Sequence, residues 1–222
     1  MDTPYGTSYG AFRPATDDTY YWRIAHMLFP FYAMIPAGMM GQQTRFAAYV
    51  PMDDEHTLHW EISHGLIDPE KLPFEARGSE GRAPAARATS EYRPRTTDWY
   101  GRFNLIQSMD NDYLIDREAQ RTHRSYTGIP GIRQQDMAVT ESMGPVLDRS
   151  AEHLGTTDAL IIRTRRRLIA AARALEEHGH VPPGVDTPEL YRQRSGGVLL
   201  PREVNRWEAT EHRRTEFVAA RA

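Results

Sequence analysis

The sequence predicts an α+β fold in which antiparallel strands are followed by one long helix. Residues 1–64 contain alternating and aromatic-rich stretches typical of strands, whereas apolar residues further along recur at helical spacing. A sheet with one apolar face is stable when a helix packs against it. We therefore expect a curved sheet to grip the helix, leaving between them a cavity suited to a small aromatic ligand.

Strands account for the first third of the chain. Tyr20–Phe31 is apolar on both alternating faces, which indicates a strand covered on both sides. Gln43–Pro51 and Thr57–Ser63 flank the polar turn at residues 53–55, so they predict an antiparallel hairpin. Thr3–Arg13 is a further candidate strand, weakened by its glycines.

Residues 65–108 are predicted to form a long loop or lid. Prolines interrupt the stretch and apolar periodicity disappears from residue 65 to residue 100. Long loops inside compact domains are often functional, but a disordered connection remains the alternative.

The segment 109–178 is predicted to hold the candidate metal ligand and the long helix. Thr156 or Thr157 suits the N-cap, and the helix should run to His178 with Gly179 as its terminator. Its arginine cluster (163 and 165–167) is interpreted as a solvated face. Residues 179–222 read as an extended tail, in which Arg202–Ala220 is a candidate closing helix. The whole chain, 1–222, is taken as a single incomplete domain.

Composition excludes several functions. The 222 residues carry a formal net charge of −3, which gives no reason to expect nucleic acid or a membrane as partner. With no cysteine, the chain cannot form a disulfide, a thiolate zinc site or a cysteine-bound iron–sulfur cluster. No signal peptide or spanning segment is recognised, so a cytoplasmic location is expected.

Asp136 is the candidate metal ligand. It precedes a segment of modest helical character, so its carboxylate can cap a helix or donate an oxygen to iron. An iron site of the second kind needs two neutral imidazoles beside one carboxylate. From sequence alone no histidine pair forms a convincing ligand set with Asp136, and the two interpretations stay open.

The other polar clusters favour structural roles. His56, His59, Glu61 and His64 could hold a divalent metal, but a hydrated polar face is the simpler account. His26 is interpreted as a hydrogen-bonded core histidine. No catalytic residue and no cofactor-binding motif can be assigned. The remaining groups are given structural roles: His178 and His180 at a helix end, the acidic residues 110, 112 and 116, and the polar residues 148, 149, 152 and 153.

The sequence contains four distinctive motifs, Asn111–Glu118, Tyr126–Ile132, Gln135–Pro145 and Asp148–Gly155. They closely resemble the oxygenase subunits of phthalate 4,5-dioxygenase and of related enzymes that demethylate lignin-derived biaryls. The resemblance covers essentially the whole chain and is densest over residues 110–160.

The resemblance implies a Rieske non-haem iron oxygenase with a helix-grip catalytic domain. In that family a mononuclear Fe(II) activates dioxygen beside an aromatic substrate. A 2Fe-2S cluster in a separate N-terminal domain passes on electrons from a flavin or iron–sulfur reductase. Asp136 aligns with the iron-binding carboxylate of the family, and the intact enzyme is expected to be a homo-oligomer, a trimer. Substrate and reaction, dihydroxylation or O-demethylation, stay undetermined.

The sequence also departs from that family. The Rieske domain and the histidine pair of the iron site have no counterpart here, so we expect a C-terminal part of the catalytic domain that is inactive alone. Whether it is a truncated gene, a wrong start codon or a genuine split subunit is left open. The alternatives are a helix-grip module that binds an apolar ligand, and a split half that assembles with an N-terminal partner chain.

Overall fold

The computed structural model describes residues 1–36, 38–41, 44–64 and 90–215. Its contacts divide the chain into two compact units. The first unit combines residues 1–77 with 151–222, and the second consists of residues 78–150.

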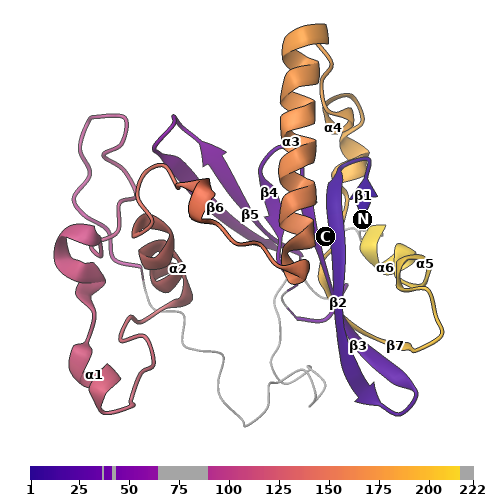
Figure 1. Ribbon diagram of the computed structural model, residues 1–222, viewed down its shortest axis with the longest axis horizontal. Coiled ribbons are helices and arrows are strands. Elements are labelled where there is room, and N and C mark those ends of the chain that lie inside the picture. Colours follow the sequence, from indigo (N-terminus) through magenta and orange to yellow (C-terminus); the bar gives the residue numbers. More distant parts are fainter. Residues whose placement is uncertain (37, 42–43, 65–89, 216–222) are drawn as a thin grey trace, which may run out of the picture. The chain divides into compact units, whose positions relative to one another are not determined.

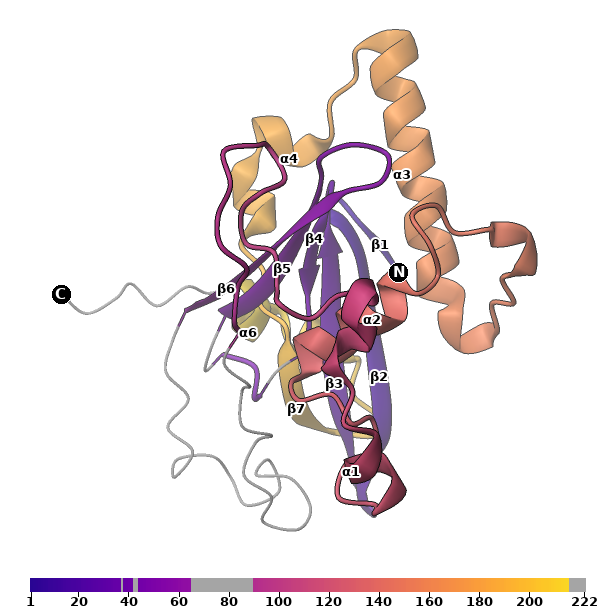
Figure 2. The same cartoon turned by 90° about the vertical axis from the view of Figure 1, so that its left-hand side faces the viewer.

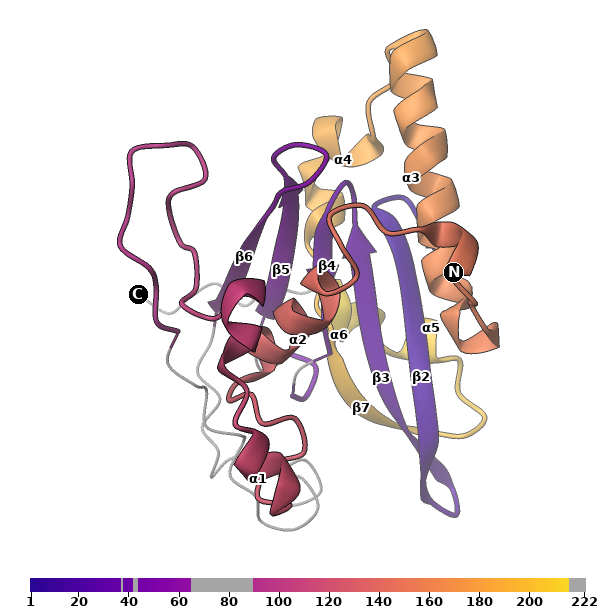
Figure 3. The ribbon, with the colours of Figure 1, turned by 60° about the vertical axis from the view of Figure 1, so that its left-hand side comes forward.

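The first unit is built on an antiparallel sheet of seven described strands. Its order is β1-β2-β3-β4-β5-β6, and Figure 3 shows β2 to β6 side by side. One edge of β3 pairs with β2, while the other edge is shared by β7 and β4. The strands are β1 (Asp2–Thr3), β2 (Gly6–Thr16), β3 (Thr19–Leu28), β4 (Tyr32–Met34), β5 (Thr44–Pro51), β6 (Thr57–His64) and β7 (Gly196–Pro201).

The strand predictions are largely confirmed. Strand β3 is buried on both faces at Ile24, Ala25 and His26, as its apolar sequence indicated. The hairpin of β5 and β6 is also confirmed, with Tyr49 opposite His59. The interpretation of residues 179–222 as an extended tail was wrong, because β7 lies within this segment and pairs along β3.

The long helix α3 (Ala159–His178) follows the strands in sequence, as predicted. It ends at Gly179, whose φ of 68° is the left-handed conformation that closes many helices. Thr156 and Thr157 do not cap it. They lie in a short 3₁₀ turn (Thr156–Asp158), and Asp158 precedes the first helical residue.

Helix α3 and the C-terminal segment cover opposite faces of the sheet. Thr7 of β2 contacts Thr164 of α3, whereas Leu28, on the other face, packs with Trp207. Figure 1 shows α3 along one side of β2, with α5 and α6 on the other side. The short helices after α3 are α4 (Pro183–Asp186), the 3₁₀ turn Pro188–Tyr191, α5 (Arg206–Ala209) and α6 (Glu211–Thr215).

The core of this unit consists of two apolar clusters on that second face. One joins β3 to β7 through Ile24, Val198 and Leu200. The other gathers Tyr5, Leu28 and Met34, and the C-terminal residues Leu190, Tyr191 and Trp207 pack against it. The C-terminal segment is therefore a structural part of the sheet layer.

The second unit contains helices α1 (Arg117–Arg121) and α2 (Ile132–Glu141) and the turn segment Met109–Leu114, and the 3₁₀ turn Arg149–Ala151 lies at its boundary with the first unit. Tyr92 and Leu105 form a single antiparallel bridge in the preceding segment. Most of the predicted lid, residues 65–89, lies outside the described residues.

The predicted α+β class, an antiparallel sheet followed by a long helix, is confirmed. Among the described residues, no helix has the length and apolar character needed to cross a bilayer.

Candidate functional site

Asp136 lies in the middle of α2. The helix begins at Ile132, after the N-cap residue Gly131, so the interpretation of Asp136 as a helix cap was wrong. Its side chain is exposed, and its carboxylate makes no hydrogen bond or ion pair with any other described residue. Its backbone carbonyl accepts a hydrogen bond from the Thr140 hydroxyl. The carboxylate is thus available to a ligand.

Tyr113 joins α2 to the turn segment Met109–Leu114. The ring is 5% exposed, and its hydroxyl donates a 2.9 Å hydrogen bond to the carboxylate of Glu141, at the end of α2. Burial, and then the neighbouring Glu141, raise the pKa of Tyr113 to about 12. The hydroxyl therefore stays protonated and keeps donating at every physiological pH.

The backbone that presents Tyr113 is strained. Asp112, Tyr113 and Leu114 have φ values of 49°, 53° and 53°, a left-handed run without any glycine. Each such residue costs about 1–2 kcal/mol relative to the right-handed region. Strain of this kind persists where surrounding contacts hold it in place, and it is enriched at functional sites.

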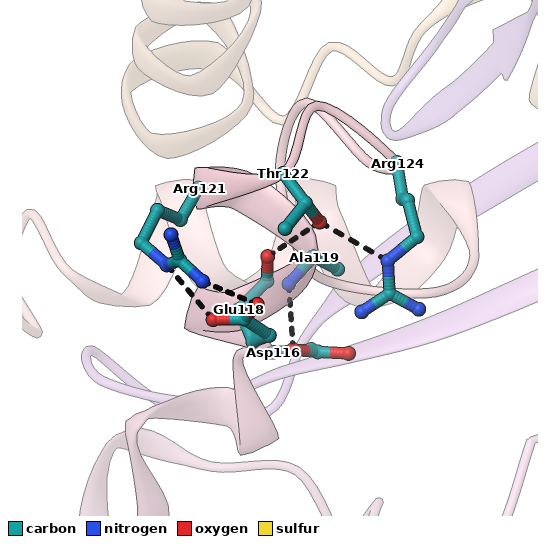
Figure 4. Close-up of polar contacts among 6 residues, drawn as sticks. All are labelled: Asp116, Glu118, Ala119, Arg121, Thr122 and Arg124. Carbon is teal, nitrogen blue, oxygen red and sulfur yellow. Dashed lines mark hydrogen bonds and ion pairs between the residues drawn. The ribbon is translucent and has the colours of Figure 1, made fainter.

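Two further contacts order the chain between the turn segment and α2. The amide of Asp116 donates to the carbonyl of Gly128, and the side-chain amide of Gln135 donates to the carbonyl of Ile129. Around α1, Asp116 caps the helix by accepting from the Ala119 amide, as Figure 4 shows. Three of the four sequence motifs are thus joined by hydrogen bonds within the second unit.

Figure 4 also shows how α1 is closed at its other end. Arg121 forms two hydrogen bonds with the carboxylate of Glu118, and Thr122 donates to the Glu118 carbonyl. Arg124 in turn donates to the Thr122 hydroxyl. These side chains form hydrogen bonds with one another around a five-residue helix. Such local hydrogen bonds support a structural role for this motif.

The histidine cluster of the β5–β6 hairpin is engaged in local contacts. His59 stacks on Tyr49 with ring centroids 4.8 Å apart, and Glu61 is paired with Arg45. His56 is hydrogen-bonded to Asp53 at 2.9 Å, and the side chain of His64 lies outside the described residues. Within the described part of the chain, no three metal-binding side chains come together.

The described residues therefore do not fit a complete mononuclear iron site. Asp136 offers one carboxylate, and no described histidine joins it in a ligand set. A two-histidine, one-carboxylate centre needs two further imidazoles. Within the second unit, the described residues do not supply these imidazoles around Asp136.

His26 is confirmed as a hydrogen-bonded core histidine. Its Nε2 lies 3.1 Å from the Arg194 carbonyl oxygen, which can only accept, so Nε2 carries the proton. Its Nδ1 then accepts from the Tyr5 hydroxyl at 3.0 Å. Burial lowers the pKa of His26 to about 4 and raises that of Tyr5 to about 12, so both groups are neutral at pH 7.

Arg214 extends this buried polar cluster. It is 3% exposed, donates to Gln193 and Thr210, and lies 3.4 Å above the ring of Trp207. Burial lowers the pKa of its guanidinium below the usual value. Apart from His26, the members of this cluster could not be predicted from the sequence, because they come from both ends of the chain and follow no local motif.

The interpretation of the α3 arginines as a solvated face holds for Arg163 and Arg166, which are exposed, but not for Arg165 and Arg167, which are partly buried and have specific partners. Arg163 pairs with Asp2 at 2.6 Å, and Arg165 forms two hydrogen bonds with Glu152, at 2.5 and 2.9 Å. Arg167 donates to the carbonyl oxygens of Thr3 and Gly6. The motif that contains Glu152 is thereby attached to the long helix.

Two hollows adjoin α3. One has a volume of about 280 Å³ and is lined by Phe29, Arg167, His180 and the alanines at positions 170, 171 and 174, among others. The second, of about 580 Å³, lies among Asp2, Ile162 and the arginines 163, 166 and 167. Both are open to solvent, so neither resembles the closed apolar cavity expected for a small aromatic ligand.

Comparison with known proteins gives consistent matches. The family model described as "LigXa C-terminal domain like" matches residues 1–193. The 3-chlorobenzoate-3,4-dioxygenase oxygenase subunit of Comamonas testosteroni is 42% identical over 216 residues, which are 97% of this chain and 50% of that protein. The phthalate 4,5-dioxygenase oxygenase subunit of Pseudomonas putida is 30% identical over 179 residues, which are 78% of this chain and 37% of that protein.

This chain thus spans half or less of the length of the curated relatives it matches. The resemblance inferred from the motifs is confirmed, because both relatives are oxygenase subunits of aromatic-compound dioxygenases. The matched family covers the whole described sheet except β7, together with both units up to residue 193. The chain belongs to the LigXa C-terminal domain-like family.

Proposed function

We propose that this chain is the C-terminal part of the catalytic region of a Rieske non-haem iron oxygenase. The intact enzyme would hydroxylate or O-demethylate a carboxylated aromatic compound, using dioxygen and electrons supplied by a reductase. The main observation in support of this proposal is the family match over residues 1–193. Two relatives that are oxygenase subunits of dioxygenases add further support.

In this proposal Asp136 donates one carboxylate oxygen to a mononuclear Fe(II). Bound there, the iron would activate dioxygen next to the aromatic substrate. The exposed, unpaired carboxylate of Asp136 supports the assignment, as does the position of the residue on a helix whose end is held by Tyr113. The imidazole ligands and the 2Fe-2S cluster would come from polypeptide equivalent to the half of the relatives that this chain does not cover.

Turnover by the chain alone provides the first test. We expect no product when the purified chain is mixed with a reductase, dioxygen and a carboxylated aromatic such as 3-chlorobenzoate. The physical reason is that one carboxylate does not hold a redox-active iron, and a chain without cysteine cannot bind a cysteine-ligated iron–sulfur cluster to supply electrons. Product formation at an enzymatic rate by the chain alone would contradict the proposal.

A module that binds an apolar ligand without chemistry is the second candidate. Although it is open to solvent, the hollow beside Phe29 would be its binding site, because three alanines and an aromatic ring line it and Arg167 carries a cation for a carboxylate. Calorimetric titration with 3-chlorobenzoate distinguishes the two functions. Tight binding that is independent of iron and lost in Arg167→Gln would favour the module.

A further inference from the structure

A basic hollow opens beside the first half of helix α3. It has a volume of about 580 Å³ and is lined by Ala159, Ile162 and three arginines of the helix, together with Asp2 of β1. All of these residues belong to the first unit. Figure 2 shows the start of the chain beside α3, where Asp2 pairs with Arg163. We refer to this space as the arginine hollow.

The three arginines, Arg163, Arg166 and Arg167, are neighbours on the surface of the helix. Residues three and four positions apart have about 5–6 Å between their Cβ atoms, so Arg163 is next to both of the others. Like charges at this spacing repel one another and destabilise a helix. The cluster is therefore unfavourable unless negative charge offsets it.

The described residues that line the arginine hollow do not supply enough negative charge. Asp2 is the one carboxylate among them, and Arg163 pairs with it at 2.6 Å. Arg167 donates to two backbone carbonyl oxygens, which carry no net charge, and Arg166 makes no hydrogen bond or ion pair with another described residue. Three guanidinium groups thus share one carboxylate, which leaves two uncompensated positive charges in the lining.

Two of the guanidinium groups are already held in place. Arg163 pairs with Asp2 through Nε, and Arg167 contacts the carbonyl oxygens of Thr3 and Gly6 through Nη1. A guanidinium group carries five N–H donors, so both side chains keep donors that no described residue uses. Side chains that are ordered before a ligand arrives lose little conformational entropy when they bind it.

We propose that the arginine hollow binds a phosphate group. Such a group carries a charge of about −1.5 to −2 near pH 7, which matches the two uncompensated positive charges. Its oxygens accept several hydrogen bonds at once, and planar guanidinium groups donate to them in pairs. A single carboxylate or a halide would neutralise only one of the two charges. The inference goes beyond the proposed function and does not depend on Asp136.

Calorimetric titration with inorganic phosphate tests the proposal, at a constant ionic strength of about 0.1 M, where the Debye length is about 10 Å. Arg166→Gln removes a guanidinium group that contacts no other described residue, so the variant should fold normally. Arg173→Gln is the matched control, because Arg173 is exposed on the same helix and does not line the hollow. Circular dichroism confirms that both variants are folded.

We expect saturable binding of phosphate that is about tenfold weaker in Arg166→Gln, because hydrogen bonds between two charged groups are lost. Arg166→Lys should recover only part of the affinity, since lysine keeps the charge but cannot donate in pairs. Arg173→Gln should change Kd by at most about twofold, because salt screens a charge at this distance. No saturable binding, or equal weakening in Arg166→Gln and Arg173→Gln, would overturn the proposal.

Amide chemical shifts report where the phosphate binds. Its addition should shift the signals of residues 162–167 and leave those of residues 175–178, at the other end of α3, unchanged. Shifts confined to other parts of the chain would overturn the assignment of the site. Titration with glycerol phosphate separates the two sources of the group. Tighter binding than that of inorganic phosphate would identify a phosphate ester as the ligand, and weaker binding would identify the free ion.

Discussion

At the scale of single residues, the left-handed run Asp112–Leu114 gives a direct prediction. Leu114 has a φ of 53° and a side chain that is 50% exposed. Leu114→Gly and Leu114→Ala remove the same side-chain contacts, but only glycine adopts positive φ at little cost. We expect the glycine variant to be about 1 kcal/mol more stable than the alanine variant in urea unfolding. Equal stabilities would show that the strain is absent.

His26 gives the second prediction at this scale. Its pKa is about 4 in the folded chain and 6.5 in the unfolded chain, so the unfolded chain binds more protons between these values. Stability should therefore fall as the pH is lowered from 6.5 to 4, by at most about 3 kcal/mol, and then level off with respect to this group.

Urea unfolding measured across this pH range checks the His26 prediction. His26→Gln has no titrating ring, so its stability should fall less steeply with decreasing pH, whatever its stability at pH 7. The facing hydroxyl of Tyr5, whose pKa is raised to about 12 by burial, keeps its proton over the same range. If the free energy of unfolding depended on pH in the same way in both proteins, the assignment of His26 as a buried neutral histidine would be contradicted.

At the scale of secondary-structure elements, the contact between Tyr113 and Glu141 stabilises α2 against the turn segment Met109–Leu114. Tyr113→Phe leaves the ring in place and removes the donor from Glu141. We expect the free energy of unfolding to fall by about 1–2 kcal/mol. Amide hydrogen exchange in α2 should also become faster. Tyr126→Phe is the matched control, because Tyr126 is 99% exposed in the same unit. Similar effects of the two substitutions would show that the hydrogen bond from the Tyr113 hydroxyl to Glu141 does not stabilise α2.

Elements with strong local signals could be predicted from the sequence. The β5–β6 hairpin has alternating strands around a polar turn, and α3 has a regular apolar stripe before Gly179. Strand β7 could not be predicted, because it opens with two glycines and is defined by its pairing with β3. The partners of Arg163 and Arg167 lie more than 150 positions away in the chain, so no local pattern identified them.

The candidate site was only partly predictable. A motif identifies Asp136 as a candidate ligand. Its place in the middle of α2 depends on the start of the helix at Ile132, after the N-cap residue Gly131, which the sequence did not predict. The supporting contact of Tyr113 depends on a left-handed backbone that non-glycine residues rarely adopt, so propensities did not indicate it.

At the scale of the whole molecule, the first unit forms a sheet layer with its own core, whereas the proposed iron site would need ligands beyond Asp136. The C-terminal segment covers one face of the sheet through Tyr191, Trp207 and Arg214. Asp136 has no metal-binding companions among the described residues, and the relatives are at least twice as long as the matched region. These observations agree with a catalytic region that is completed by other polypeptide.

Iron binding tests this account most directly. Fe(II) is titrated anaerobically into the chain alone and into its complex with a separately purified polypeptide. That polypeptide is the half of the Comamonas testosteroni oxygenase subunit to which this chain does not align. We predict no stoichiometric binding by the chain alone and one iron per complex, lost in Asp136→Asn and retained in Asp110→Asn, which alters an exposed carboxylate of the same unit. Iron retained by the Asp136→Asn complex, or held stoichiometrically by the chain alone, would contradict the account.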